Sequence, residues 1–164
     1  MNWKILLLSG IVPVIVGFIC YRSNVFGKVW MNTASHTSER LKGVRLPVLF
    51  VLAYLFGLLI SLALMPMVIH QMHLSSFLMD TPGFGEPGSE VQNLFESIMK
   101  KYGTNFRSFK HGALHGVIAA IFFAMPVVGM SALFERRGFK YVAIHTGFWI
   151  VCLGLMGGIL CAYL

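Results

Sequence analysis

Four histidines occur as two closely spaced pairs that could bind a metal. His70 and His73 are three residues apart, and His111 and His115 are four residues apart. Both spacings place the paired side chains on one face of a helix. Neutral imidazole is the most common metal ligand, and four such rings suit zinc, copper or iron, or a haem held through axial positions. If the two helices are neighbours, these histidines form a candidate site for a transition metal or a haem.

The alternative interpretation is that the same histidines are polar residues at the ends of membrane helices. Ligating histidines usually donate their second ring nitrogen to a carboxylate or carbonyl group. Neither histidine pair has a carboxylate on its own helical segment, so Asp80 or Glu86 of the intervening loop would have to serve. On this interpretation the rings only pack at a half-hydrated boundary, and no cofactor is assigned.

His145 is a third candidate, because it lies inside an apolar segment, where ionisable residues are usually functional. Tyr141, one turn earlier, and Thr146 could satisfy its ring nitrogens. A small-solute or ion pathway gated by His145 would require several copies of so short a chain. The sequence contains no GxSxG, HExxH or phosphate-binding glycine motif, so it predicts no enzyme class.

The elements that would position these residues are membrane helices. Apolar residues make up 57% of the 164 residues and charged residues 12%, whereas soluble domains have about a quarter charged. The apolar residues form four blocks that are long enough to cross a bilayer, at about 3–21, 46–69, 112–134 and 141–164. We therefore predict an all-α integral membrane protein, a four-transmembrane-helix bundle in one membrane domain, with the lipid bilayer as its first partner.

Two shorter helices are expected in the connections. Residues 90–102 have apolar side chains at the spacing of an amphipathic helix, after a capping Ser89. This extra helix should lie on the membrane surface or against the end of the bundle. Residues 37–43 could form a single helical turn.

Small residues repeat every four positions on three of the predicted spans. In lipid, such stripes allow helix backbones to approach closely. They are Gly112, Gly116, Ala120 and Ala124; Ala53, Gly57 and Ser61; and Gly154, Gly158 and Ala162. We expect the first two stripes to pack together, which leaves the third for a homodimer or a membrane-complex partner. This pattern favours a structural or accessory protein without catalysis.

The distribution of basic residues predicts the orientation. The formal charge is +7, but basic and aromatic residues do not alternate as they do in nucleic-acid-binding segments, so no nucleic-acid partner is expected. Residues 22–45 and 135–140 contain eight Lys and Arg residues, whereas the opposite side has five, mixed with acids. Because cytoplasmic loops are rich in Lys and Arg, both termini are predicted outside the cytoplasm of a bacterial inner (plasma) membrane.

Residues Tyr21 to Met31 follow the first span and read YRSNVFGKVWM. This segment resembles the Tyr…Phe-Gly-Lys-x-Trp-Met signature of a bacterial four-span membrane family known as domain of unknown function 1761. The last span, from Phe139 to Leu160, is similar to that family as well. The resemblance implies the architecture and carries no activity. Phe26 and Trp30 of the signature are four residues apart and should pack together at the interface, as a structural elbow or as part of a site.

Overall fold

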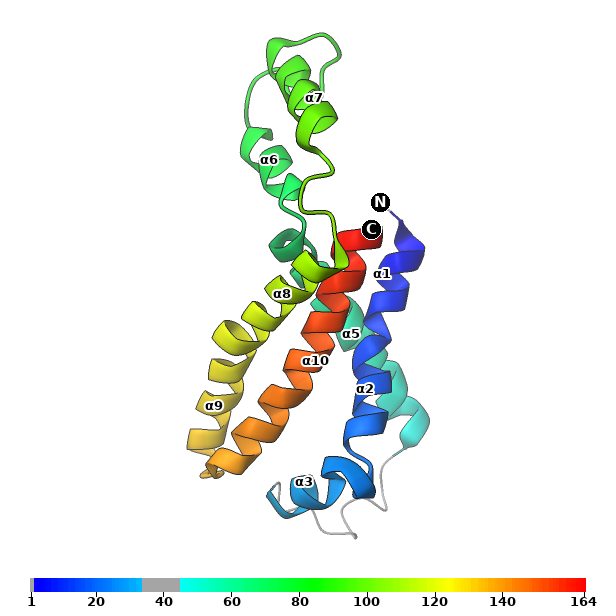
Figure 1. The fold of residues 1–164 in the computed structure, drawn as a ribbon, viewed down its shortest axis with the longest axis vertical. Helices are drawn as coiled ribbons and strands as arrows, with labels where there is room; N and C mark the ends of the chain where they lie inside the picture. Colours follow the sequence, from blue (N-terminus) through cyan, green and yellow to red (C-terminus); the bar gives the residue numbers. More distant parts are fainter. Residues whose placement is uncertain (1, 34–44) are drawn as a thin grey trace.

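The computed structural model describes residues 2–33 and 45–164, and every regular element within them is helical. Four helical stretches in these residues are long and apolar enough to cross a membrane: Trp3–Cys20, Leu46–Val68, Phe109–Phe134 and Phe139–Tyr163. The predicted all-α fold class, with four helices long and apolar enough to span a membrane, is therefore confirmed. Figure 1 shows both termini at the same end of the four long helical stretches. The helical turn expected at 37–43 lies outside the described residues.

Prolines shape two of the spans. The first span consists of α1 (Trp3–Gly10) and α2 (Val12–Cys20), which meet at Ile11, and Pro13 lies in the first turn of α2. The third span consists of α8 (Phe109–Ala119), a π-helical turn η2 (Ala120–Ala124) and α9 (Met125–Phe134). Pro126 has no amide hydrogen, and its ring would clash with the carbonyl group four residues earlier in a regular helix. The wider π turn just before Pro126 relieves that clash.

The tightest seam joins the third span to the fourth, which is the single helix α10 (Phe139–Tyr163). A Cβ atom at Gly112 would overlap the carbonyl oxygen of Gly157, and one at Gly116 would overlap that of Leu153. The backbones therefore touch at positions where only glycine fits. The stripe that begins with Gly112 and Gly116 does form a seam. The prediction that it packs mainly on the second span was wrong, because its partner is the fourth span.

The second span, α5 (Leu46–Val68), packs instead on the first. Gly57 lies against the backbone of Gly10, and the hydroxyl of Ser9 donates to that of Ser61 at 2.7 Å, with both serines fully buried. The first span thus has its own pair of small residues, Ser9 and Gly10. They are adjacent in sequence, so the search for small residues repeating every four positions did not find them. The fourth-span stripe is not spare, because it packs on α8: Gly158 lies against Phe109.

Connections close the two ends of the bundle. Between the second and third spans, α6 (Gln71–Leu78) and α7 (Glu90–Tyr102) stand beyond the end where the termini lie (Figure 1). Helix α7 confirms the predicted amphipathic helix, and the hydroxyl of Ser89 accepts from the amide of Gln92 at 3.1 Å. At the opposite end, a π turn η1 (Ser23–Gly27) leads into the short helix α3 (Lys28–Thr33). We refer to this as the α3 end.

Candidate functional site

Three of the four predicted metal ligands converge at the end of the bundle that carries α6 and α7. One ring nitrogen from each of His70, His111 and His115 lies within 4.8 Å of the other two. The Nε2 atoms of His70 and His111 are 2.8 Å apart, and the rings of His111 and His115 have centroids 4.5 Å apart. We call these three residues the His cluster.

The helix ends explain this convergence. Helix α5 stops at Val68 because Ile69 adopts an extended conformation (φ −110°, ψ 91°), which turns the chain so that His70 is the N-cap residue of α6. Helix α8 begins after Ser108, whose hydroxyl accepts from the amide of His111 at 3.3 Å. His111 and His115 each precede a glycine of the α8–α10 seam by one residue, a rotation of about 100° around the helix. The seam with α10 therefore fixes the direction in which the histidine stripe faces.

The loop before α8 forms the outer wall of the His cluster. The side-chain amide of Gln71 donates to the carbonyl oxygen of Asn105 at 2.8 Å, which joins α6 to this loop. The ring of Phe106 packs on His111, with centroids 4.9 Å apart. The carbonyl oxygen of Phe106 accepts from the thiol of Cys161 at 3.2 Å, which joins the loop to the end of α10. Sequence reasoning missed these wall residues, because nothing in their types or spacing marks them.

The fourth predicted ligand, His73, lies beside the cluster with a different partner. Its ring centroid is 6.4 Å from that of His70, but its Nε2 atom lies 2.6 Å from the carbonyl oxygen of Pro66. That carbonyl belongs to the last turn of α5, where the helix leaves its final acceptors without amide donors. The structure therefore assigns His73 to the end of α5, and the His cluster has three members.

The surroundings of His70 favour its neutral form. Burial and then the neighbouring rings of His111 and His73 lower the pKa of His70 below its usual value. A neutral imidazole has the lone pair that a metal requires, so protons compete only weakly at neutral pH. Among the described residues, no carboxylate or cysteine joins the cluster. Three imidazoles with an open fourth position are typical of catalytic rather than structural zinc sites.

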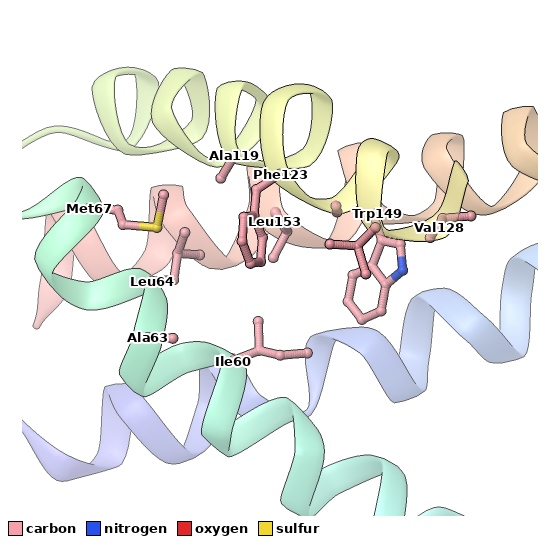
Figure 2. A pocket seen from close by; sticks show the side chains of 11 residues that line it. Ile60, Ala63, Leu64, Met67, Ala119, Phe123, Val128, Trp149 and Leu153 are labelled. Atoms are coloured by element: carbon pink, nitrogen blue, oxygen red, sulfur yellow. The ribbon is translucent and has the colours of Figure 1, made fainter. Parts of the chain in front are cut away.

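An apolar cavity of about 280 Å³ lies between α5, the third span and α10 (Figure 2). Its wall includes Met67, Ala119, Phe123 and Trp149. Ala119 follows His115 by four residues, so this wall residue lies about one turn from the His cluster along α8. Phe123 comes from the π turn, which therefore shapes the wall. The cavity can hold an apolar group at membrane depth.

The other candidate residues lie at the opposite end of the bundle. The hydroxyl of Tyr21 lies 3.2 Å from Nδ1 of His145, and the ring of Tyr141 packs on His145 with centroids 4.3 Å apart. Trp30 packs on Tyr21, with centroids 5.1 Å apart, whereas Phe26 lines a cavity between α2 and α10. The Tyr21–His145 pair was not predicted, because 124 residues separate the two in sequence. The family-like signature and the intramembrane histidine thus belong to one cluster.

Comparison with family models gives a match over residues 5–161 to a family described as "Protein of unknown function (DUF1761)". No curated protein and no solved structure matches the chain. The match covers the four spans and both clusters described above, and it agrees with the resemblance seen at Tyr21–Met31.

Proposed function

The chain belongs to the DUF1761 family of proteins of unknown function. We propose that this member is a multi-pass membrane protein that binds one transition-metal ion. The ligands are His70, His111 and His115. The observation that carries this proposal is that one ring nitrogen of each lies within 4.8 Å of the others. In a tetrahedral zinc site with Zn–N bonds of about 2.0–2.1 Å, ligand nitrogens lie roughly 3.3–3.4 Å apart. Small side-chain rotations would bring the three nitrogens to that spacing.

The ligand set favours zinc or copper. Imidazole suits both ions, whereas magnesium and calcium prefer oxygen ligands. The geometry supports a single ion over a haem, because the rings of His70 and His111 are in contact, with centroids 4.9 Å apart. A porphyrin would have to separate such a pair to be held between them. With three protein ligands, the fourth position is open to water or to a small ligand.

We further propose that the His cluster faces the outside of a bacterial inner membrane. The support is the charge bias of the sequence: the connections at 22–45 and 135–140 carry eight basic residues, and the described parts of both lie at the α3 end. Such loops remain in the cytoplasm. The His cluster would then draw its ion from the periplasmic side.

A structural role without any ligand has less support from the geometry. The prediction of such a role was based on a stripe of small residues on the fourth span that was expected to be free to bind a partner. Gly157 and Gly158 of that span pack instead on Gly112 and Phe109 of the same chain. A pathway at His145 likewise has no support beyond the position of that residue in a span.

The experiment is metal analysis of untagged protein purified in detergent. We expect about one zinc or copper ion per chain, and its loss in a variant that carries both His111→Ala and His115→Ala. His73→Ala is the matched control, because its ring lies next to the cluster without contributing a nitrogen. Cobalt(II) added to the apo protein should give visible absorption bands of a four-coordinate site. If the double variant kept its metal, or if the wild-type chain took up no zinc, copper or cobalt, the proposal would be wrong.

A further inference from the structure

A second cavity lies at the α3 end, between α2 and α10, far from the His cluster. Its volume is about 400 Å³, within the range of sites that bind small ligands. Its wall combines Cys20, Tyr21 and Phe26 from the first span and the elbow after it with Ile144, Gly147 and Val151 from α10. Almost all of this lining is hydrocarbon, and it lies where the spans approach the membrane surface.

Three basic residues, Arg22, Lys28 and Lys140, flank the lining of this cavity along the chain, and we refer to them as its basic mouth. On α10, Lys140 precedes Ile144 by one turn and therefore lies on the same face, at the end nearest the aqueous phase. On the first-span side, Arg22 follows Tyr21 directly, with its guanidinium carbon 5.8 Å from the ring centroid of Phe18, and Lys28 follows Phe26 by two residues. All three basic side chains are exposed.

The charge of this end is unbalanced among the residues that the structure describes. The basic residues here are Arg22, Lys28, Arg45, Arg136, Arg137 and Lys140. Glu135 is the described carboxylate at this end, and it pairs with Arg137 at 3.5 Å. Arg137 also donates to the carbonyl oxygen of Thr33 at 3.4 Å, so it ties α3 to the turn before α10. The positive charge at the cavity mouth is therefore not balanced by acids of the described chain.

We propose that this cavity and its basic mouth form a binding site for an anionic phospholipid. The acyl chain occupies the apolar cavity, and the phosphate group lies between Arg22 and Lys140. An apolar cavity under a basic rim complements a lipid that combines hydrocarbon with a negative head group, and basic pockets between spans are typical sites for such lipids. A protein helix, about 10 Å across, does not fit a cavity of about 400 Å³. The site is independent of the metal.

Gly147 allows the acyl-chain position to be tested. A Cβ atom added at Gly147 would meet no other atom within 4 Å, and Gly147 lines the cavity, so we expect a leucine there to occupy cavity space. Gly129 on α9 has the same open surroundings and does not line this cavity. Gly129→Leu is therefore the matched control for Gly147→Leu.

Native mass spectrometry of the full chain in detergent, titrated with phosphatidylglycerol, provides the measurement. We expect one adduct per chain that survives at a collision energy at which phosphatidylcholine is lost. Gly147→Leu should weaken that adduct at least tenfold, and Arg22→Gln combined with Lys140→Gln should do the same. Gly129→Leu and Lys100→Gln, at the other end of the bundle, should have no effect. Thermal unfolding of each variant checks that the protein is still folded.

Several outcomes would overturn the proposal. If Gly147→Leu bound phosphatidylglycerol as tightly as the wild type, the acyl chain would not occupy this cavity. If phosphatidylcholine formed an equally stable adduct, or if the Arg22 and Lys140 variant bound normally, the head group would not be recognised. Binding of inorganic phosphate alone with equal affinity would show an anion site without a lipid.

Discussion

The imidazole of His73 donates a hydrogen bond to the carbonyl oxygen of Pro66, across 2.6 Å. A carbonyl oxygen only accepts, so the hydrogen must be on Nε2 of the ring. In a continuing helix, this carbonyl would accept from the amide of His70, but the extended conformation of Ile69 ends α5 first. Two histidines three residues apart therefore have different roles: His73 caps the end of a span, and His70 faces α8.

This difference predicts that His73→Ala retains the metal and lowers stability. Loss of one hydrogen bond to a helix end should reduce the free energy of unfolding by about 1 kcal/mol. Thermal unfolding of the metal-free protein measures the loss, and elemental analysis measures the retained ion. Equal metal loss in His73→Ala and His115→Ala would contradict the assignment.

The metal-free protein should lose stability as the pH falls below neutral. The pKa of His70 is lowered in the folded chain, so below its ordinary value of about 6.5 the unfolded chain binds more protons than the folded one. Unfolding midpoints of apo protein between pH 8 and pH 5 test this, and His70→Asn should flatten the curve. Stability that rises on acidification would rule out this explanation.

Gly116→Ala should disrupt the seam between α8 and α10. The new methyl group would overlap the carbonyl oxygen of Leu153, and such overpacking typically costs about 1–3 kcal/mol. Gly129→Ala provides the control, because its Cβ atom has open space and alanine favours a helix over glycine by about 1 kcal/mol. Unfolding in detergent should separate the two variants, with the first destabilised and the second unchanged or stabilised. Equal behaviour of both would mean that the seam is looser than described.

The hydroxyl groups of Ser9 and Ser61 should be energetically coupled. They form a 2.7 Å hydrogen bond between α1 and α5 and are fully buried. Hydrogen bonds between membrane helices contribute about 0.6 kcal/mol on average and up to about 1.7 kcal/mol. A double-mutant cycle with Ser9→Ala and Ser61→Ala measures this coupling directly. Strictly additive effects would show that each serine contributes only through its own helix, as with the bond from Ser61 to the carbonyl oxygen of Gly57.

The spans and α7 could be predicted from sequence because hydropathy and helical periodicity are local properties. Which spans pack together is not local. Gly57 and Gly112 both belong to small-residue stripes, yet each packs on a residue that the stripe comparison did not pair with it, Gly10 and Gly157. Any small stripe can fit any other, so the pairing depends on how the connections bring the helices together.

The candidate site was predictable in part for the same reason. The spacing of His111 and His115 placed both rings on one face, and chain order placed His70 at the same end of the bundle. Nothing in the sequence could show that His73 would form a hydrogen bond with the carbonyl oxygen of Pro66. The Tyr21–His145 contact likewise depends on how α2 packs against α10.

An ion at the His cluster would also act as a cross-link. His70 and His111 are 41 residues apart, and α6 and α7 lie in the loop between them. Joining the ends of a loop of that length removes chain entropy from its unfolded form, worth about 4 kcal/mol if the joint is as firm as a disulfide. Removal of the ion by a chelator should therefore unfold the connection that contains α6 and α7. It would expose residues 71–108 to proteases and leave the four membrane helices intact.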